Sequence, residues 1–207
     1  MEAFEDKMRR GGSAAIAEAS QFFMRNDPVH RTLRKIAEKL NKLQVPYAVA
    51  GGMALVAHGY DRTTVDVDIL VAPAGLESIH RQLVGLGYLP PFTGSKHLRD
   101  TEHGVKIEFL VAGQFPGDGK PKPVAFPDPA TLAFEKDGIR YVPLPTLCEL
   151  KLASGMTNAG RLKDLADVQE LIRALMLPRE FADQLNPYVR EKFVELWAAV
   201  SNDTSDQ

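Results

Sequence analysis

The chain has 207 residues, of which 44% are hydrophobic and 25% are charged, as is typical of a soluble globular protein. Its formal net charge of -2 provides no overall positive field to attract nucleic acid, although the sequence does not exclude a local basic patch. The single cysteine, Cys148, excludes an intramolecular disulfide and a cysteine-based zinc site. The amino terminus does not resemble a signal peptide, and no apolar run reaches about 18 residues. We therefore expect a cytoplasmic protein with no membrane partner.

The first firm element is predicted directly after a weakly patterned stretch. Residues 1–26 are expected to form an N-terminal arm. Asp27 is a candidate N-cap, and Pro28 suits the first position of a helix. The apolar residues that follow at spacings of four and three, which define one helix face, are Val29, Leu33, Ile36, Leu40 and Leu43.

Short strands and helices then alternate along the chain. "PYAVA" predicts a buried strand that ends at Gly51-Gly52, and "MALVAHG" predicts a short helix that ends at Gly59. Thr64–Val71 predicts a strand with alternating faces, "LESIHRQLVGLGY" a helix, and "KHLRDTEHGVKIEFLV" a hairpin. This order predicts an α/β (α+β) fold, in which residues 27–143 form a mixed sheet flanked by helices.

The remaining segments have a different character. The stretch 113–129 is dense in glycine and proline, which predicts a long irregular loop whose role stays open. Residues 144–200 predict a C-terminal helical region, and residues 201–207 a polar tail. The stripe expected within that region consists of Leu162, Leu165, Val168, Leu171, Ile172 and Leu175.

Two carboxylates interrupt the strand Thr64–Val71. Side chains two residues apart leave the same face of a strand, so Asp66 and Asp68 project together. Neighbouring carboxylates stay ionised only opposite cations, and such oxygen ligands favour Mg²⁺, with Mn²⁺ as an alternative. Glu108 is the only acid in "VKIEFLV" and reaches the same site if its strand is adjacent; otherwise it faces solvent. Three acids on adjacent strands predict two metals about 4 Å apart, an arrangement suited to displacement at phosphorus.

The glycine pair before the acids predicts a phosphate site. Gly51 and Gly52 lie between a strand and a helix, where backbone N–H groups can approach a phosphate without obstruction by a Cβ atom. The alternative is a simple tight turn. No dinucleotide fingerprint or Walker-type motif is present, so the glycine pair alone is weak evidence. A glycine pair followed by D-x-D on a strand and then by a lone strand glutamate is more specific.

"GGMALVAHGYDRTTVDVDILV" resembles the G-[GS]…D-x-D core of the nucleotidyltransferase superfamily that includes DNA polymerase β. The similarity is strongest to AbiEii-type and other minimal nucleotidyltransferases of bacterial toxin–antitoxin systems. "LPTLCELKLASG…RLKDLADVQEL" also resembles their helical region, so the resemblance covers roughly residues 30–175. Gly52 stands where many members of the superfamily have serine, whereas the toxin-like branch commonly has Gly-Gly.

The resemblance implies a magnesium-dependent enzyme that transfers a nucleoside monophosphate from an NTP to an acceptor hydroxyl. It implies phosphate binding at Gly51 and Gly52, with Lys151 as a candidate for contacting the nucleotide phosphates. The residues that it implies as catalytic metal ligands are Asp66, Asp68 and Glu108. The acceptor stays open between tRNA or another RNA, a protein and a small molecule, and a cognate antitoxin is a candidate partner.

Several charged residues have two interpretations. Arg62 either contacts the phosphate or base of the nucleotide or pairs with Asp61, and Lys151 could be an ordinary exposed helix lysine. Asp164 and Asp167 are expected to form a surface charge cluster or a clamp between helix and sheet rather than to contact substrate. The five histidines show no metal-ligand spacing, so a zinc site is not expected.

Two other functions stay open from the sequence. One is a catalytically silent nucleotidyltransferase-like protein that works as a binding module or antitoxin. The intact D-x-D motif and third acid argue against it, because strand carboxylates that serve no ligand cost stability. The other is a nucleotidyltransferase that modifies a small molecule such as an aminoglycoside.

Overall fold

The computed structural model describes residues 6, 22, 25–132 and 134–205. The strands are β1 (Tyr47–Val49), β2 (Asp66–Val71), β3 (Tyr88–Leu89), β4 (Leu98–Asp100), β5 (Lys106–Val111), β6 (Phe134–Lys136) and β7 (Ile139–Tyr141). The α-helices are α3 (Pro28–Lys42), α4 (Gly51–Ala57), α5 (Pro73–Leu83), α6 (Leu144–Thr157), α7 (Leu162–Leu175) and α8 (Pro187–Ser205). Three 3₁₀ turns, η1 (Pro129–Thr131), η2 (Ala159–Arg161) and η3 (Arg179–Gln184), complete the assignment. The predicted arm, residues 1–26, lies almost entirely outside the described residues.

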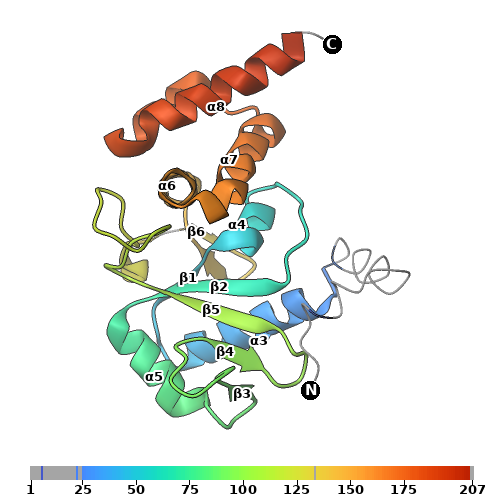
Figure 1. Cartoon of the computed structure of the whole chain (residues 1–207). Helices are drawn as coiled ribbons and strands as arrows, with labels where there is room; N and C mark the ends of the chain where they lie inside the picture. The colour runs from blue at the N-terminus through green and yellow to red at the C-terminus, as the bar shows by residue number, and fades with distance from the viewer. Residues whose placement is uncertain (1–5, 7–21, 23–24, 133, 206–207) are drawn as a thin grey trace.

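The strands form one mixed sheet in the order β3-β4-β5-β2-β1-β7-β6. The central strand β2 pairs antiparallel with β1 and parallel with β5, and β4 and β5 form the predicted antiparallel hairpin. Helices α3 and α5 lie on one side of the sheet, and α4 followed by α6, α7 and α8 lies on the other (Figure 1). The predicted α/β fold with a C-terminal helical region is confirmed.

Helix α3 begins where the sequence predicts. The carboxylate of Asp27 accepts hydrogen bonds from the backbone N–H groups of Val29 and His30, at 2.8 and 3.3 Å, and Pro28 occupies the first turn. The apolar face is buried against the sheet at Val29, Leu33, Ile36 and Leu40, and Leu43 is partly buried. The helix therefore covers the side of β2 that lies opposite the two aspartates.

Three strands were missed at the sequence level. β3, β6 and β7 have only two or three residues each, too short for an alternating pattern to be recognised. β7 pairs in parallel with β1 at Val49 and Tyr141, so these strands extend the sheet beyond β1. Their contribution comes from tertiary pairing rather than from local pattern.

Two leucines in segments that the sequence predicts to be helical are exposed. Leu86 is 74% exposed because α5 ends at Leu83 and the chain then passes through Gly85 and Gly87, both with positive φ. Leu162 is 63% exposed because it begins α7, ahead of the turns that pack on α6.

The C-terminal region is helical, as predicted, with two local differences. η3 precedes α8 as a separate 3₁₀ segment, and α8 continues to Ser205, so the predicted polar tail is mostly helical. The single cysteine is buried in α6, where burial raises the pKa of the Cys148 thiol to about 12. Within the described chain, no helix combines the length and the apolar character needed to span a membrane.

Candidate functional site

The three acids predicted as metal ligands lie on one face of two adjacent strands. β2 and β5 are parallel and in register, so Asp68 is paired with Glu108 and Asp66 with Lys106. Val67, Ile69 and Ile107, which are the alternate residues of these strands, are fully buried on the opposite face of the sheet. The carboxylates of Asp66, Asp68 and Glu108 all line one cavity of about 500 Å³. The structure thus brings together the three acids that the sequence pattern linked.

The electrostatics of this face are dominated by the central aspartate. Burial, the neighbouring Asp66 and then Glu108 raise the pKa of the Asp68 carboxyl to about 7. Asp66 accepts a hydrogen bond of 2.8 Å from the hydroxyl of Thr64, and Glu108 forms an ion pair with Lys106. No described residue donates a hydrogen bond to the Asp68 carboxylate. This part of the cavity therefore carries excess negative charge that a cation would neutralise.

The three acids lie on adjacent strands, but their carboxylate oxygens are not clustered closely enough to surround one metal ion. In the described chain they do not form a group whose ligand atoms all lie within 4.8 Å of one another. The Lys106 ammonium beside Glu108 neutralises part of the charge from within the protein. The predicted pair of metals about 4 Å apart would require these side chains to move toward each other.

Both residues of the glycine pair pack where a side chain would not fit. Gly51 has a φ of +56°, and a Cβ atom there would lie 1.8 Å from Oδ2 of Asp68. A Cβ atom on Gly52 would lie 2.7 Å from the Cβ atom of Thr64. This glycine turn, the first turn of α4, thus holds its backbone directly against the acid face, which is the side of β2 and β5 that carries Asp66, Asp68 and Glu108. The N-cap residue Ala50 offers no side-chain hydrogen bond to the start of α4.

The lysine of α6 is buried between two acids of α7. The ammonium of Lys151 lies 3.0 Å from Asp164 Oδ1 and 2.6 Å from Asp167 Oδ2, and only 8% of the residue is exposed. Asp164 also accepts a hydrogen bond of 2.7 Å from Ser154. The surface interpretation of these charges is therefore wrong. The lysine is buried, Asp167 is 4% exposed, and the acids join α7 to α6 rather than to the sheet.

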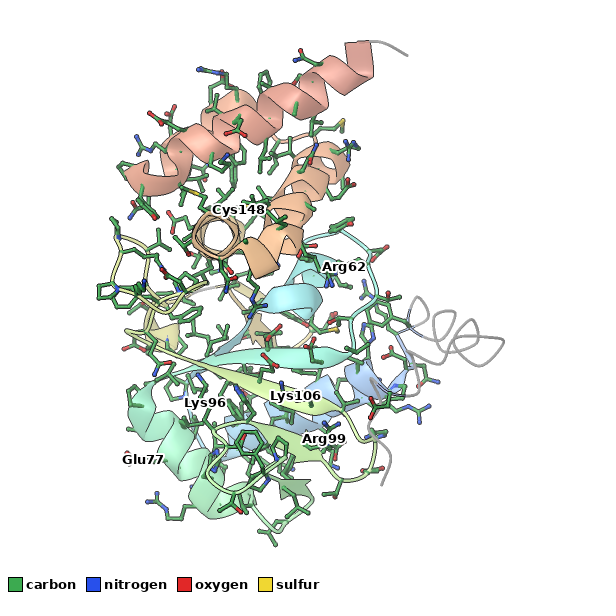
Figure 2. The ribbon with its side chains drawn as sticks, in the orientation of Figure 1. Arg62, Glu77, Lys96, Arg99, Lys106 and Cys148 are labelled. Carbon is green, nitrogen blue, oxygen red and sulfur yellow. The ribbon has the colours of Figure 1, made fainter. Side chains whose placement is uncertain are left out.

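Arg62 pairs with Asp167 rather than with Asp61. It lies on the segment between α4 and β2, beside the helical region (Figure 2). Its NH1 group donates a hydrogen bond to Asp167 Oδ1. The Nε atom of Arg62 is buried without a hydrogen-bond partner. Arg62 and Lys151 therefore both line the cavity while sharing one carboxylate. The sequence pattern that could have predicted this network is a shared spacing. Lys151 and Ser154 are three residues apart on one helix, as Asp164 and Asp167 are on the next, so each pair lies on one helix face.

The cavity also contains residues that the sequence did not single out. Arg161, the last residue of η2, and Lys163, in the first turn of α7, add two cationic side chains. The apolar part of the lining is formed by Leu110, Pro116, Phe126, Leu147 and Leu150. Two of these come from the loop 113–129, whose role stayed open at the sequence level, so this loop forms one wall of the cavity.

A second cluster of potential metal ligands lies at the turn between β4 and β5. The ligand atoms of Asp100, Glu102 and His103 all lie within 4.8 Å of one another, so this group could hold a metal ion. The ammonium of Lys35 already lies among them, 2.7 Å from Asp100 and 2.9 Å from Glu102. The spacing of the histidines did not predict this group. It could have been predicted from the four titratable residues in the five-residue segment "RDTEH".

The chain was compared with models of known protein families and with curated proteins, and neither comparison gave a match.

Proposed function

We propose that the protein is a magnesium-dependent nucleotidyltransferase that transfers a nucleoside monophosphate from an NTP to an acceptor hydroxyl. One observation carries the proposal. The glycine turn at Gly51 packs against Asp68, and Asp68 is in register with Glu108, so the phosphate-site candidate and the acid face share one cavity. The sequence resemblance to nucleotidyltransferases supports the same function.

The acid face fits a divalent cation. Three carboxylates are hard oxygen ligands of the kind that Mg²⁺ prefers, with Mn²⁺ as an alternative. Burial and then repulsion from Asp66 and Glu108 raise the pKa of Asp68, and a bound cation would favour its charged form. Asp66, Asp68 and Glu108 would hold the metal, with Lys106 released from Glu108. When bound, the metal would neutralise phosphate charge and make the acceptor hydroxyl easier to deprotonate.

The other cavity residues would bind and orient the nucleotide. Gly51 and Gly52 line the cavity at the N-terminus of α4, where their backbone N–H groups would bind phosphate oxygens, and Arg62 and Lys151 contribute cationic groups to the same lining. Asp167, which bonds to both cations, would hold them in position. In the reaction, the acceptor oxygen forms a bond to the α-phosphorus while the bond to pyrophosphate breaks, and the hydroxyl proton leaves to solvent. Positioning and charge neutralisation lower the barrier.

The test is to incubate the protein with each α-labelled NTP and Mg²⁺, together with total RNA, a protein extract or aminoglycosides. Asp66→Ala serves as the inactive variant. Transfer of label that is lost in Asp66→Ala would support the proposal and identify the acceptor class. The alternative is a silent binding module or antitoxin. Absence of transfer to every acceptor, with no Mg²⁺-dependent NTP binding, would favour that alternative.

A further inference from the structure

The loop 113–129 is a fixed part of the structure. Its two ends are joined by backbone hydrogen bonds of 2.8 Å from Gly113 N–H to the Phe126 carbonyl and from Phe126 N–H to the Gln114 carbonyl. The chain therefore leaves the end of β5, travels around the loop and returns to the same place. A compact loop with joined ends is often functional. Phe126 is consequently held by its backbone beside Gly113 and Gln114, directly after the end of β5.

The far part of the loop is attached to the helical region. Gly117 packs so closely on α6 that a Cβ atom there would lie 2.2 Å from Thr157 Oγ1 and 2.8 Å from the Ser154 carbonyl. The Asn158 side chain donates to the Gly117 carbonyl at 3.3 Å. Figure 1 shows the loop, in yellow-green, rising from the end of β5 toward α6. The loop is thus attached both to the sheet, at the end of β5, and to the helical region, at α6. Its residues Pro116, Gly117 and Phe126 line the cavity.

The cavity changes character along β5. Side chains two apart share a face of the strand, so Lys106, Glu108 and Leu110 follow one another along the cavity side. Beyond Glu108, β5 contributes Leu110 to the cavity, and the half-buried Phe126, bonded to Gly113 and Gln114 just after β5, also lines it. Leu147 and Leu150 of α6 add further apolar lining. The charged section contains the glycine turn and the cations, and it would take the phosphates. An apolar section with an aromatic ring, continuous with a phosphate site, matches the chemistry of a nucleobase.

We propose that Phe126, held by the loop 113–129, forms the nucleobase subsite of this cavity. The base would pack on the Phe126 ring and against the leucines, while the triphosphate lies over the glycine turn. This inference rests on the proposed nucleotidyltransferase function and adds to it the residue that binds the base. The subsite presents mainly apolar surface, so stacking rather than hydrogen bonding to base edges would provide the affinity.

The experiment separates the base from the phosphates by measuring two ligands. Calorimetric binding of ATP and of inorganic tripolyphosphate, both with Mg²⁺, is compared for the wild type, Phe126→Ala and Phe126→Leu. Phe92→Ala is the matched control, because Phe92 is an exposed phenylalanine outside the cavity. Thermal unfolding of each variant shows whether it is folded at the temperature of the measurement.

We expect Phe126→Ala to weaken ATP binding by about 5- to 100-fold, as loss of one stacked base contact would do, and to leave tripolyphosphate binding within about twofold. Phe126→Leu, which keeps apolar volume but lacks the ring, should lie between the wild type and Phe126→Ala. Phe92→Ala should change neither affinity.

Four results would overturn the inference, and they differ in what they say of the proposed function. If wild type binds tripolyphosphate as tightly as ATP, or if Phe126→Ala binds ATP like wild type, the base subsite is wrong while the function stands. If folded Phe126→Ala and Phe126→Leu weaken both ligands equally, the loop acts on the phosphates instead. If wild type binds neither ligand, the proposed function fails as well.

Discussion

Asp68 on β2 and Glu108 on β5 are register partners in a parallel strand pair, although forty positions separate them in the chain. Because the strands are in register, both side chains leave the same face of the sheet, and Asp66 leaves it two positions earlier. The backbone of Gly51 packs directly on the carboxylate of Asp68. This contact joins the glycine turn to the acid face. The crowding of charge around Asp68 motivates the first two predictions, and the contact with Gly51 motivates the third.

Asp68→Asn should stabilise the metal-free protein at neutral pH. The folded-state pKa of about 7 lies above the ordinary value of 3.8, so the folded protein holds a proton that the unfolded chain releases between these values. Unfolding free energy should therefore fall as pH rises from about 4 to 7, and Asp68→Asn should remove this slope, gaining up to about 4 kcal/mol above pH 7. Urea unfolding of both proteins across this pH range measures the slope and the gain in unfolding free energy.

The same variant should lose stabilisation by Mg²⁺. Wild type should unfold at higher temperature with millimolar Mg²⁺ than with chelator, whereas Asp68→Asn should show no shift. Glu77→Gln, which removes an exposed carboxylate on α5, is the control and should behave like wild type. An equal Mg²⁺ effect in Asp68→Asn would show that the ion binds elsewhere, for example at the Asp100 cluster.

Gly51→Ala should destabilise the fold by more than the cost of its backbone conformation. Alanine at positive φ costs about 1–2 kcal/mol, and here the new Cβ atom would also collide with Asp68. Gly94→Ala is the matched control, because Gly94 has a φ of +82° with open space where its Cβ atom would be. If the two variants lose equal free energy of unfolding, Asp68 gives way easily and the contact at Gly51 is not tight.

Lys151→Met should destabilise the protein by about 3 kcal/mol, because it removes the buried cation from Asp164 and leaves Asp167 with Arg62 alone. The double variant with Asp167→Asn should lose less than the sum of the two single variants, since one interaction is then removed twice. Lys42→Met removes a lysine from the exposed pair with Glu38 and should change stability by less than about 1 kcal/mol. Additive losses at Lys151 and Asp167 would contradict the proposed coupling.

Asp100→Asn should destabilise the protein at neutral pH but much less in acid. Burial alone would raise the pKa of Asp100, but hydrogen bonds from Lys35, His103 and Thr32 outweigh it and hold the pKa below 3.8. A lowered carboxyl pKa contributes stability that is present above the unfolded value and lost as pH falls through the folded one. We expect a difference of about 2 kcal/mol at pH 7 that shrinks below pH 4. Urea unfolding of wild type and Asp100→Asn at several pH values measures this difference in unfolding free energy. A difference that stays constant with pH would contradict the prediction.

Local pattern was sufficient for the elements that carry their own signals. Asp27-Pro28 predicted the start of α3 because a capping carboxylate and a fixed proline φ act within one turn. The alternation around Asp66 and Asp68 predicted one shared face because strand geometry has a period of two. The strands β3, β6 and β7 were missed because two or three residues carry no period, and pairing with neighbours makes them strands.

The candidate site divides in the same way. The sequence by itself determined which residues could carry the chemistry: a glycine pair, two acids on one strand face and a third acid in a later strand. Only the tertiary structure decided the β2–β5 register that places Glu108 beside Asp68, the burial of Lys151 between Asp164 and Asp167, and the seating of Phe126 in the cavity wall. The physical reason is that residue type and spacing act within a few residues, whereas register, burial and cavity shape depend on contacts between distant segments that form only when the whole chain packs.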